Sequence, residues 1–196
     1  MRIKQAANPF DLFPSNVWRQ EVCKVKLKGK SVDGRRILLP LPPSENNRLI
    51  IGRGRSRLVN APAYRDWLNR ASNVLRIKRL FLFSDNIEEE LFALTVIVYG
   101  YKTRDITNYE KPIYDAMQQS ERVYVNDRQI KERHTMSFFD KTAPCEYVVC
   151  FLMRRADLPT RFDFDVTYED IKRYNAFIET GAEPVITPVI TELSAS

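Results

Sequence analysis

Several segments of the chain alternate between apolar and polar residues, or are almost wholly apolar, as strands do. Residues 91–101 are nearly all apolar and rich in β-branched and aromatic side chains, so we expect a central strand that is buried on both faces. Residues 21–30 alternate and predict an edge strand, followed by a turn at 31–34. The strand segments are 21–30, 36–41, 91–101, 129–139 and 146–153.

Other segments repeat their apolar residues every three or four positions, which is the period of a helix. Residues 63–80 give the clearest pattern, with Tyr64 and Trp67 on the apolar face. Residues 107–119 predict a second helix. A third is expected from Thr167 to about residue 180, because a sequence like a capping box begins it and Gly181 can end it.

The order strand, loop, helix, strand, helix, strand, strand predicts an α/β protein, with helices packed on one mixed β-sheet. We divide the chain into an N-terminal extension (1–34), a central domain (35–155) and a C-terminal extension (156–196). The last of these is expected to hold one helix and a flexible tail from residue 184.

Composition narrows the class of protein. The 196 residues are 44% apolar, which suits one globular domain. The chain has one His and three Cys without metal-ligand spacing, so any metal must be held by carboxylates. No secretory signal is visible, and the longest apolar run is about half the ~20 residues of a membrane span. We therefore expect a cytoplasmic protein without membrane contact.

Charge is distributed unevenly along the chain. The net charge is +6, and residues 48–79 carry nine Lys and Arg against one acid. Eight of the nine are Arg, whose planar guanidinium suits phosphate oxygens, so we expect a nucleic-acid partner. Within the predicted loop 44–59, the candidate phosphate-binding residues are Arg48, Arg53, Arg55 and Arg57. The alternative is a solvated basic loop without a ligand.

Polar residues that could support catalysis follow the predicted central strand. Asp105 comes directly after it, and a helix from about residue 107 would place Asn108, Lys111 and Asp115 on one face. Asp127 follows a second short apolar run. Carboxylates, an amide and a Lys suit Mg²⁺-dependent phosphoryl chemistry, because Mg²⁺ prefers oxygen ligands.

Each of these residues also has a structural interpretation. Thr107 and Glu110 could form a capping box at the start of the helix. Asp115 could pair with Lys111 one turn earlier, and Asn126 with the residue after it is an ordinary turn sequence. Spacing alone leaves both interpretations open.

Three blocks of sequence together resemble the RusA family of Holliday-junction resolvases. They are Leu39-Pro-Leu-Pro-Pro-Ser-Glu-Asn46-Asn47-Arg48, then Arg104-Asp105-Ile-Thr107-Asn108-Tyr-Glu-Lys111-Pro-Ile-Tyr-Asp115-Ala-Met, and Tyr124-Val-Asn126-Asp127-Arg-Gln-Ile. The blocks occur in the family's order and at its spacing, within residues 37–153.

The resemblance implies a homodimeric endonuclease that binds branched DNA and makes paired nicks with Mg²⁺. It makes Asp105 and Asp127 metal ligands and Lys111 the catalytic cation. The side chains that it places around the site are Arg104, Asn108 and Asn126. Those expected to bind DNA are Asn46, Asn47, Arg48, Arg53, Arg55 and Arg57.

Thr107 departs from the family pattern, which has a second acid there. Two Asp and water could hold the metal, or a neighbour such as Asp115, Glu110 or Asn126 could replace the missing acid. Otherwise the protein would bind junctions and cut them poorly. A non-catalytic branched-DNA-binding protein is therefore the alternative function, and an RNA-binding protein is a weaker one because no aromatic stacking motif is present.

Overall fold

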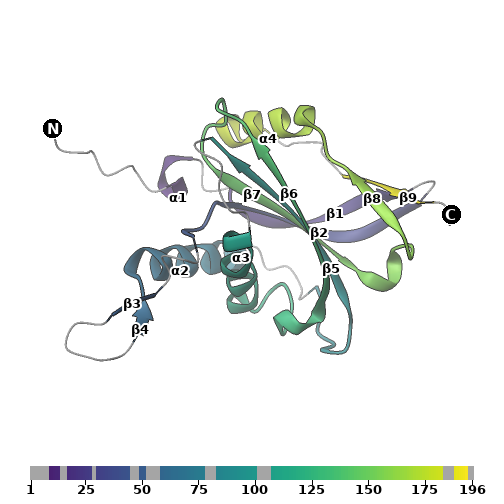
Figure 1. Cartoon of the computed structure of the whole chain (residues 1–196), viewed down its shortest axis with the longest axis horizontal. Coiled ribbons are helices and arrows are strands. Elements are labelled where there is room, and N and C mark those ends of the chain that lie inside the picture. Colours follow the sequence, from purple (N-terminus) through teal and green to yellow (C-terminus); the bar gives the residue numbers. More distant parts are fainter. Residues whose placement is uncertain are drawn as a thin grey trace.

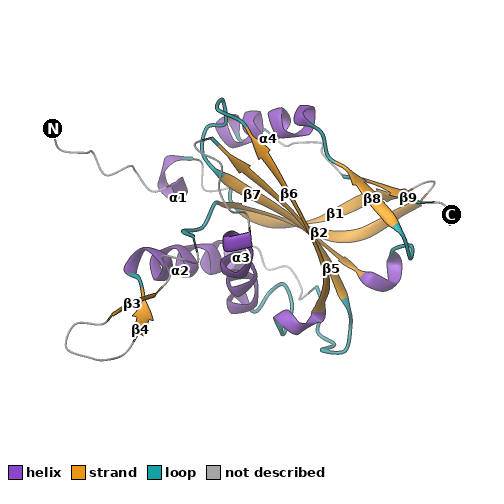
Figure 2. Cartoon of the chain, in the orientation of Figure 1, coloured by secondary structure: helices purple, strands orange, loops and turns teal. Residues whose placement is uncertain are grey.

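The computed structural model describes residues 9–13, 17–27, 30–44, 49–51, 58–77, 83–100, 107–182 and 188–193. The helices among them are α1 (Pro9–Leu12), α2 (Pro62–Ile77), α3 (Thr107–Ser120) and α4 (Tyr168–Thr180). The strands are β1 (Arg19–Leu27), β2 (Lys30–Pro40), β3 (Leu49–Ile51), β4 (Leu58–Asn60), β5 (Leu91–Tyr99), β6 (Ile130–Phe139), β7 (Tyr147–Arg154), β8 (Phe162–Asp165) and β9 (Val189–Glu192). Figure 2 shows these elements by type.

Seven strands form one mixed sheet in the order β6-β5-β7-β2-β1-β9-β8. The pairs β5–β6 and β1–β9 are parallel, and the other neighbours are antiparallel. The sheet is strongly twisted, with α4 on one side and α2 and α3 on the other (Figure 1). This confirms the predicted fold class of a mixed sheet covered by helices.

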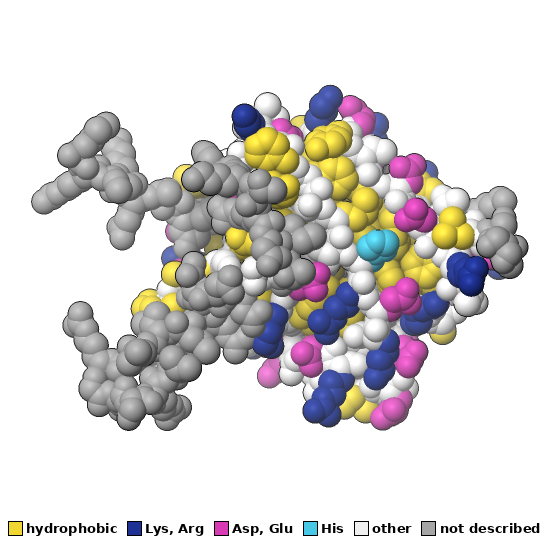
Figure 3. Space-filling model, viewed as in Figure 1, with side chains coloured by type: hydrophobic (Ala, Val, Ile, Leu, Met, Phe, Trp, Pro, Cys, Tyr) yellow, Lys and Arg dark blue, Asp and Glu magenta, His cyan; other side chains and the backbone are white. Residues whose placement is uncertain are grey.

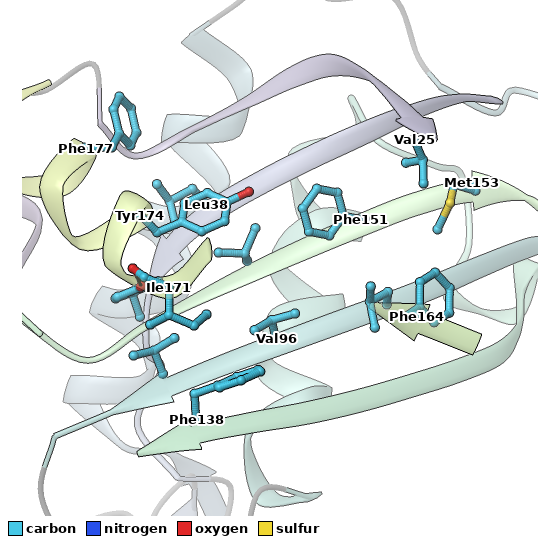
Figure 4. Close-up of a cluster of buried hydrophobic side chains, with 14 of the residues drawn as sticks. Val25, Leu38, Val96, Phe138, Phe151, Met153, Phe164, Ile171, Tyr174 and Phe177 are labelled. Carbon is cyan, nitrogen blue, oxygen red and sulfur yellow. Dashed lines mark hydrogen bonds between the residues drawn. The ribbon is translucent and has the colours of Figure 1, made fainter. Parts of the chain in front are cut away.

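Both faces of the central strand β5 are covered. Leu91, Ala93 and Ile97 pack in the cluster with α2 and α3, whereas Phe92 and Val96 belong to the cluster on the α4 side. The second cluster is drawn in Figure 4, where the α4 side chains lie over the sheet. Burial on both faces explains why residues 91–99 are apolar without alternation.

The predicted helices have the faces and ends that the sequence indicates. Tyr64 and Trp67 of α2 are buried against the sheet side, as the periodicity predicts. Thr167 accepts a hydrogen bond from the Asp170 amide in a capping box, and Gly181 ends α4 in the left-handed conformation at φ 71°. These local signals were sufficient to place both ends of α4.

Three sequence predictions about the extensions are wrong. Residues 31–34 are not a turn, because β2 runs through them and pairs with β1 along its whole length. Strand β1 is not at an edge, since it lies between β2 and β9. Residues 189–192 of the predicted flexible tail form β9, which pairs with β1 and β8. The partners in the β1–β9 pair are 163 residues apart in the sequence, so no local pattern reveals this pairing, whereas β1 and β2 form a local hairpin.

The predicted irregular loop 44–59 contains part of a hairpin. Strands β3 and β4 pair antiparallel, with Leu49 opposite Asn60. Among the described residues, no helix is long and apolar enough to cross a membrane.

Candidate active site on helix α3

Helix α3 begins shortly after the central strand, at Thr107. Arg104 and Asp105, predicted to lie in the active site, fall outside the described residues. The predicted DNA-binding residues Asn46, Asn47, Arg48, Arg53, Arg55 and Arg57 also fall outside them. The described part of the candidate site therefore consists of α3 and the structure around its two ends.

Lys111 is held in place on α3 by Asp115. The Lys111 Nζ lies 3.0 Å from Asp115 Oδ1, and the Tyr64 hydroxyl of α2 donates to Asp115 Oδ2 at 2.9 Å. The Lys111 side chain remains 46% exposed. The structural interpretation of Asp115 as the partner of Lys111 is thus confirmed, and Tyr64 adds a contact that the sequence did not suggest.

The N-terminal half of α3 is fastened to strand β6. The Glu110 carboxylate accepts a hydrogen bond from the Thr135 hydroxyl. One turn further on, the buried Tyr114 hydroxyl lies 3.1 Å from the Thr95 hydroxyl of β5. These two contacts place α3 alongside the parallel pair β5–β6, with Glu110 level with the middle of β6.

Asp127 begins a short 3₁₀ turn (Asp127–Gln129) just before β6. Asn126 caps this turn, since its side-chain oxygen accepts from the Arg128 amide at 2.9 Å. The Asp127 amide lies 3.3 Å from Gln118 Oε1 near the end of α3. The turn interpretation of residues 126 and 127 is confirmed, and the turn leaves the Asp127 side chain half-buried beside α3.

Gln129 is the residue that holds this turn in place. Its side chain is 1% exposed, and Gln129 Oε1 accepts hydrogen bonds from the amides of Val125 and Asn126, both at 2.9 Å. Its Nε2 donates to the Ser84 hydroxyl and the Asn86 carbonyl. Sequence reasoning missed this role, although Gln129 lies in the third sequence block.

The structure does not bring Asp127 to the same end of α3 as Lys111. Gln118, which contacts the Asp127 amide, lies seven residues after Lys111, or ~10 Å along the helix axis, and eleven residues after Thr107 at the start of α3, or ~16 Å. The separation measured along β6 is similar. Thr135, which contacts Glu110, lies five residues after the first residue of β6, or ~16 Å along the strand. The candidate residues therefore occupy two separate places along α3.

Two arginines of the basic segment have structural partners. Arg76 of α2 donates to the carbonyls of Gln119 and Ser120, the last residues of α3. Such a cation at a helix C-terminus satisfies carbonyls that lack a partner within the helix. Arg70 pairs with Asp11 and Asp66.

Asp127 and Asp115 offer carboxylate oxygens, the ligand type that suits Mg²⁺. However, Asp115 is already bound to Lys111 and Tyr64, and the two carboxylates are not clustered. Within the described ranges, no group of three His, Cys, Asp or Glu side chains could hold a metal ion. Asp127 fits a Mg²⁺ site in its chemistry but would need further ligands.

The family model described as Endodeoxyribonuclease RusA matches residues 40–148. The match includes Asp105, Lys111 and Asp127 and covers more than half of the 196 residues. No curated protein matches the chain. The resemblance drawn from the three sequence blocks is thus confirmed, and the chain belongs to the RusA family of endodeoxyribonucleases, the Holliday-junction resolvases.

Proposed function

We propose that this protein is a Mg²⁺-dependent endonuclease that cuts four-way or other branched DNA by paired phosphodiester hydrolysis. The match to the family model over residues 40–148 carries this proposal. The exposed cation Lys111, six residues after Asp105 in the sequence, supports it, because a phosphoryl-transfer site needs a positive charge near the reacting phosphate. The site of action would be the cytoplasm of a bacterial or infected host cell.

Asp105 and Asp127 would hold the ion in this proposal, and Arg104, Asn108 and Asn126 would lie around it. Bound Mg²⁺ supplies activation of water and neutralises charge at the scissile phosphate. Lys111 would stabilise the negative charge that develops on the phosphate oxygens. Asp115 and Tyr64 would keep the ammonium group pointed in one direction, and Gln129 would hold the turn that carries Asp127.

We further propose that the active protein is a homodimer in which each metal site takes carboxylates from both copies. Asp105 precedes the first residue of α3 by two positions, whereas Asp127 lies beside Gln118 near the other end. Mg²⁺ ligands lie only ~2.1 Å from the ion, so carboxylates at opposite ends of a helix are poorly placed to share one. A two-fold axis would bring Asp127 of one copy to the Asp105 end of the other.

Thr107 would be tolerated, because a neutral hydroxyl and water can complete the oxygen shell of Mg²⁺ beside two Asp. The competing function is branched-DNA binding without cleavage. The departure from the family pattern at Thr107 is the observation that favours it.

Cleavage of a labelled synthetic four-way junction, with Mg²⁺ and with EDTA, separates these functions. The native protein should give paired nicks only with Mg²⁺, and Asp105→Asn should bind the junction but not cut it. Tight binding by both proteins without cleavage by either would refute the nuclease and support the binding protein.

A further inference from the structure

Strand β6 has one face exposed beside the candidate catalytic helix. It is the edge strand of the sheet, and residues 131–134 are all exposed. Its even-numbered side chains from 134 to 138 face the α4 side, where His134 contacts Phe164 and Phe138 contacts Tyr168. The odd-numbered side chains from 133 to 139 face α3, as the Thr135–Glu110 hydrogen bond shows. The alternation does not extend to Lys131, because the register with β5 shifts there and Ile130 packs in the cluster with α2 and α3.

The face of β6 beside α3 is basic and polar. Arg133 and Ser137 are exposed on it, and Glu110, the α3 acid beside it, is bound to Thr135. Glu132 belongs to the opposite face, where it pairs with Arg155 at 2.7 Å. Figure 3 shows Lys and Arg side chains, interspersed with Asp and Glu, on the side of the molecule where Figure 1 draws β6.

Arg133 is positioned in advance for an anion. Its guanidinium lies 4.7 Å from the centre of the Tyr114 ring, and Tyr114 is itself fixed by the Thr95 hydroxyl. Such stacking leaves the edge of the guanidinium free to donate while reducing the side-chain entropy lost on binding. Arg133 therefore suits a phosphate contact.

The strand ends in an exposed aromatic side chain. Phe139 is 41% exposed, and its ring lies 5.6 Å from Tyr99 and 5.7 Å from the Lys141 ammonium. The Asp140 amide donates to the Tyr99 carbonyl, which ties the ends of β5 and β6 together. Tyr99 is also the last residue of β5, so Phe139 lies at the end of the sheet from which the chain continues towards Asp105.

We propose that the face of β6 formed by Arg133, Ser137 and Phe139, and continued by Lys141, binds one arm of the DNA substrate. The cations contact phosphates, and Phe139 contacts a base that is unstacked at the branch point. The positions from 133 to 139 span about 20 Å, enough to follow about six base pairs. This inference rests on the proposed function, because it names where that substrate lies.

The occupant is DNA because the face offers cations and hydroxyls, with Phe139 as its one large apolar side chain, and leads to the candidate active site.

Junction binding in EDTA at several salt concentrations tests this surface. The variant Arg133→Gln/Lys141→Gln should lower the slope of log affinity against log salt by about 1.8, since two phosphate contacts are lost. We expect at least about 10-fold weaker binding at moderate salt. The matched control is Lys172→Gln/Arg173→Gln, which removes one Lys and one Arg from exposed positions on α4, across the sheet.

Phe139→Ala should leave the salt slope unchanged and reduce the preference for a junction over linear duplex by about 10-fold, since a stacked base is lost. Phe139→Trp should retain that preference.

If the β6 double variant has the slope of the α4 control, or if Phe139→Ala keeps full junction preference, the surface is assigned wrongly. If the double variant dissociates a dimer, the proposal is also overturned, because β6 would then be part of an interface between two copies of the chain. Failure of the proposed function is distinguishable, because the native protein would then not cut a junction with Mg²⁺, whereas the test of this surface measures binding in EDTA.

Discussion

At the scale of single residues, the candidate chemistry depends on how Lys111 and Asp127 are held. Asp115 is a positioning residue for Lys111, since its carboxylate joins the Lys111 ammonium to the Tyr64 hydroxyl. The sequence presented Asp115 as either a metal ligand or an ion-pair partner, and the structure shows the ion pair. Thr107 replaces the acid of the family pattern by a neutral group, so the sequence alone does not predict its effect on metal binding and cleavage.

Lys111→Met should reduce junction cleavage by about 100-fold or more, because it removes charge stabilisation of the transition state. Asp115→Asn should reduce cleavage less, by about 10-fold, because the ammonium stays but is poorly directed. Junction affinity in EDTA should change little in either variant. Single-turnover cleavage rates measure the effect, and an Asp115→Asn loss as large as that of Lys111→Met would contradict a mere positioning role.

Thr107→Asp should keep or raise cleavage activity, since it restores a charged oxygen ligand where the family pattern has one. The measurement is the cleavage rate at limiting Mg²⁺, with a melting curve to confirm folding. A large loss of cleavage by a folded Thr107→Asp protein would argue against the alignment of the second sequence block with the family motif.

At the scale of elements, local sequence patterns predicted the bounds of most helices and strands, but they did not predict which distant strands pair. The bounds of α2, α3, β5, β6 and β7 lie within about three residues of the sequence prediction. The joining of β9 to β1 was not predictable, since the paired residues are 163 positions apart, and β8 joins the sheet only through β9. The candidate residues were found from the motif, but the roles of Tyr64 and Gln129 arise from packing between elements.

Gln129→Ala should destabilise the protein by about 2–3 kcal/mol, because it leaves buried amide groups of the Asp127 turn without partners. It should also lower cleavage, because that turn carries Asp127. Urea unfolding and junction cleavage measure the two effects. Gln119→Ala is the matched control, since it breaks only an exposed hydrogen bond to Asn69 and should cost less than about 0.5 kcal/mol.

At the scale of the whole molecule, the parts outside the family match are built into the same core. Strands β1, β8 and β9 extend the sheet, and Ile171, Tyr174 and Phe177 of α4 cover the face that α2 and α3 leave open. The division of the chain at residues 34 and 155 remains a prediction. The sheet is nevertheless continuous from β6 to β8, so truncation at these boundaries would expose its apolar face.

The fully buried Cys150 makes stability sensitive to alkaline pH. Burial raises the pKa of its thiol to about 12, compared with about 8.5 in an unfolded chain. Its contribution to stability is therefore complete below about pH 8.5 and is lost as pH rises towards 12, with a loss of about 1 kcal/mol by pH 9.5. The free energy of urea unfolding under reducing conditions should fall between pH 7 and 9.5, and the fall should be smaller in Cys150→Ala. An equal fall in both proteins would contradict this assignment.

The sharing of each metal site between two copies can be tested directly by mixing inactive variants. Asp105→Asn and Asp127→Asn should each fail to cut a four-way junction alone. After the two are unfolded and refolded together, mixed dimers should contain one intact site and should make single nicks with Mg²⁺. Cleavage by the native protein, with no recovery in a mixture shown to contain mixed dimers, would place both carboxylates in one chain and contradict the shared site.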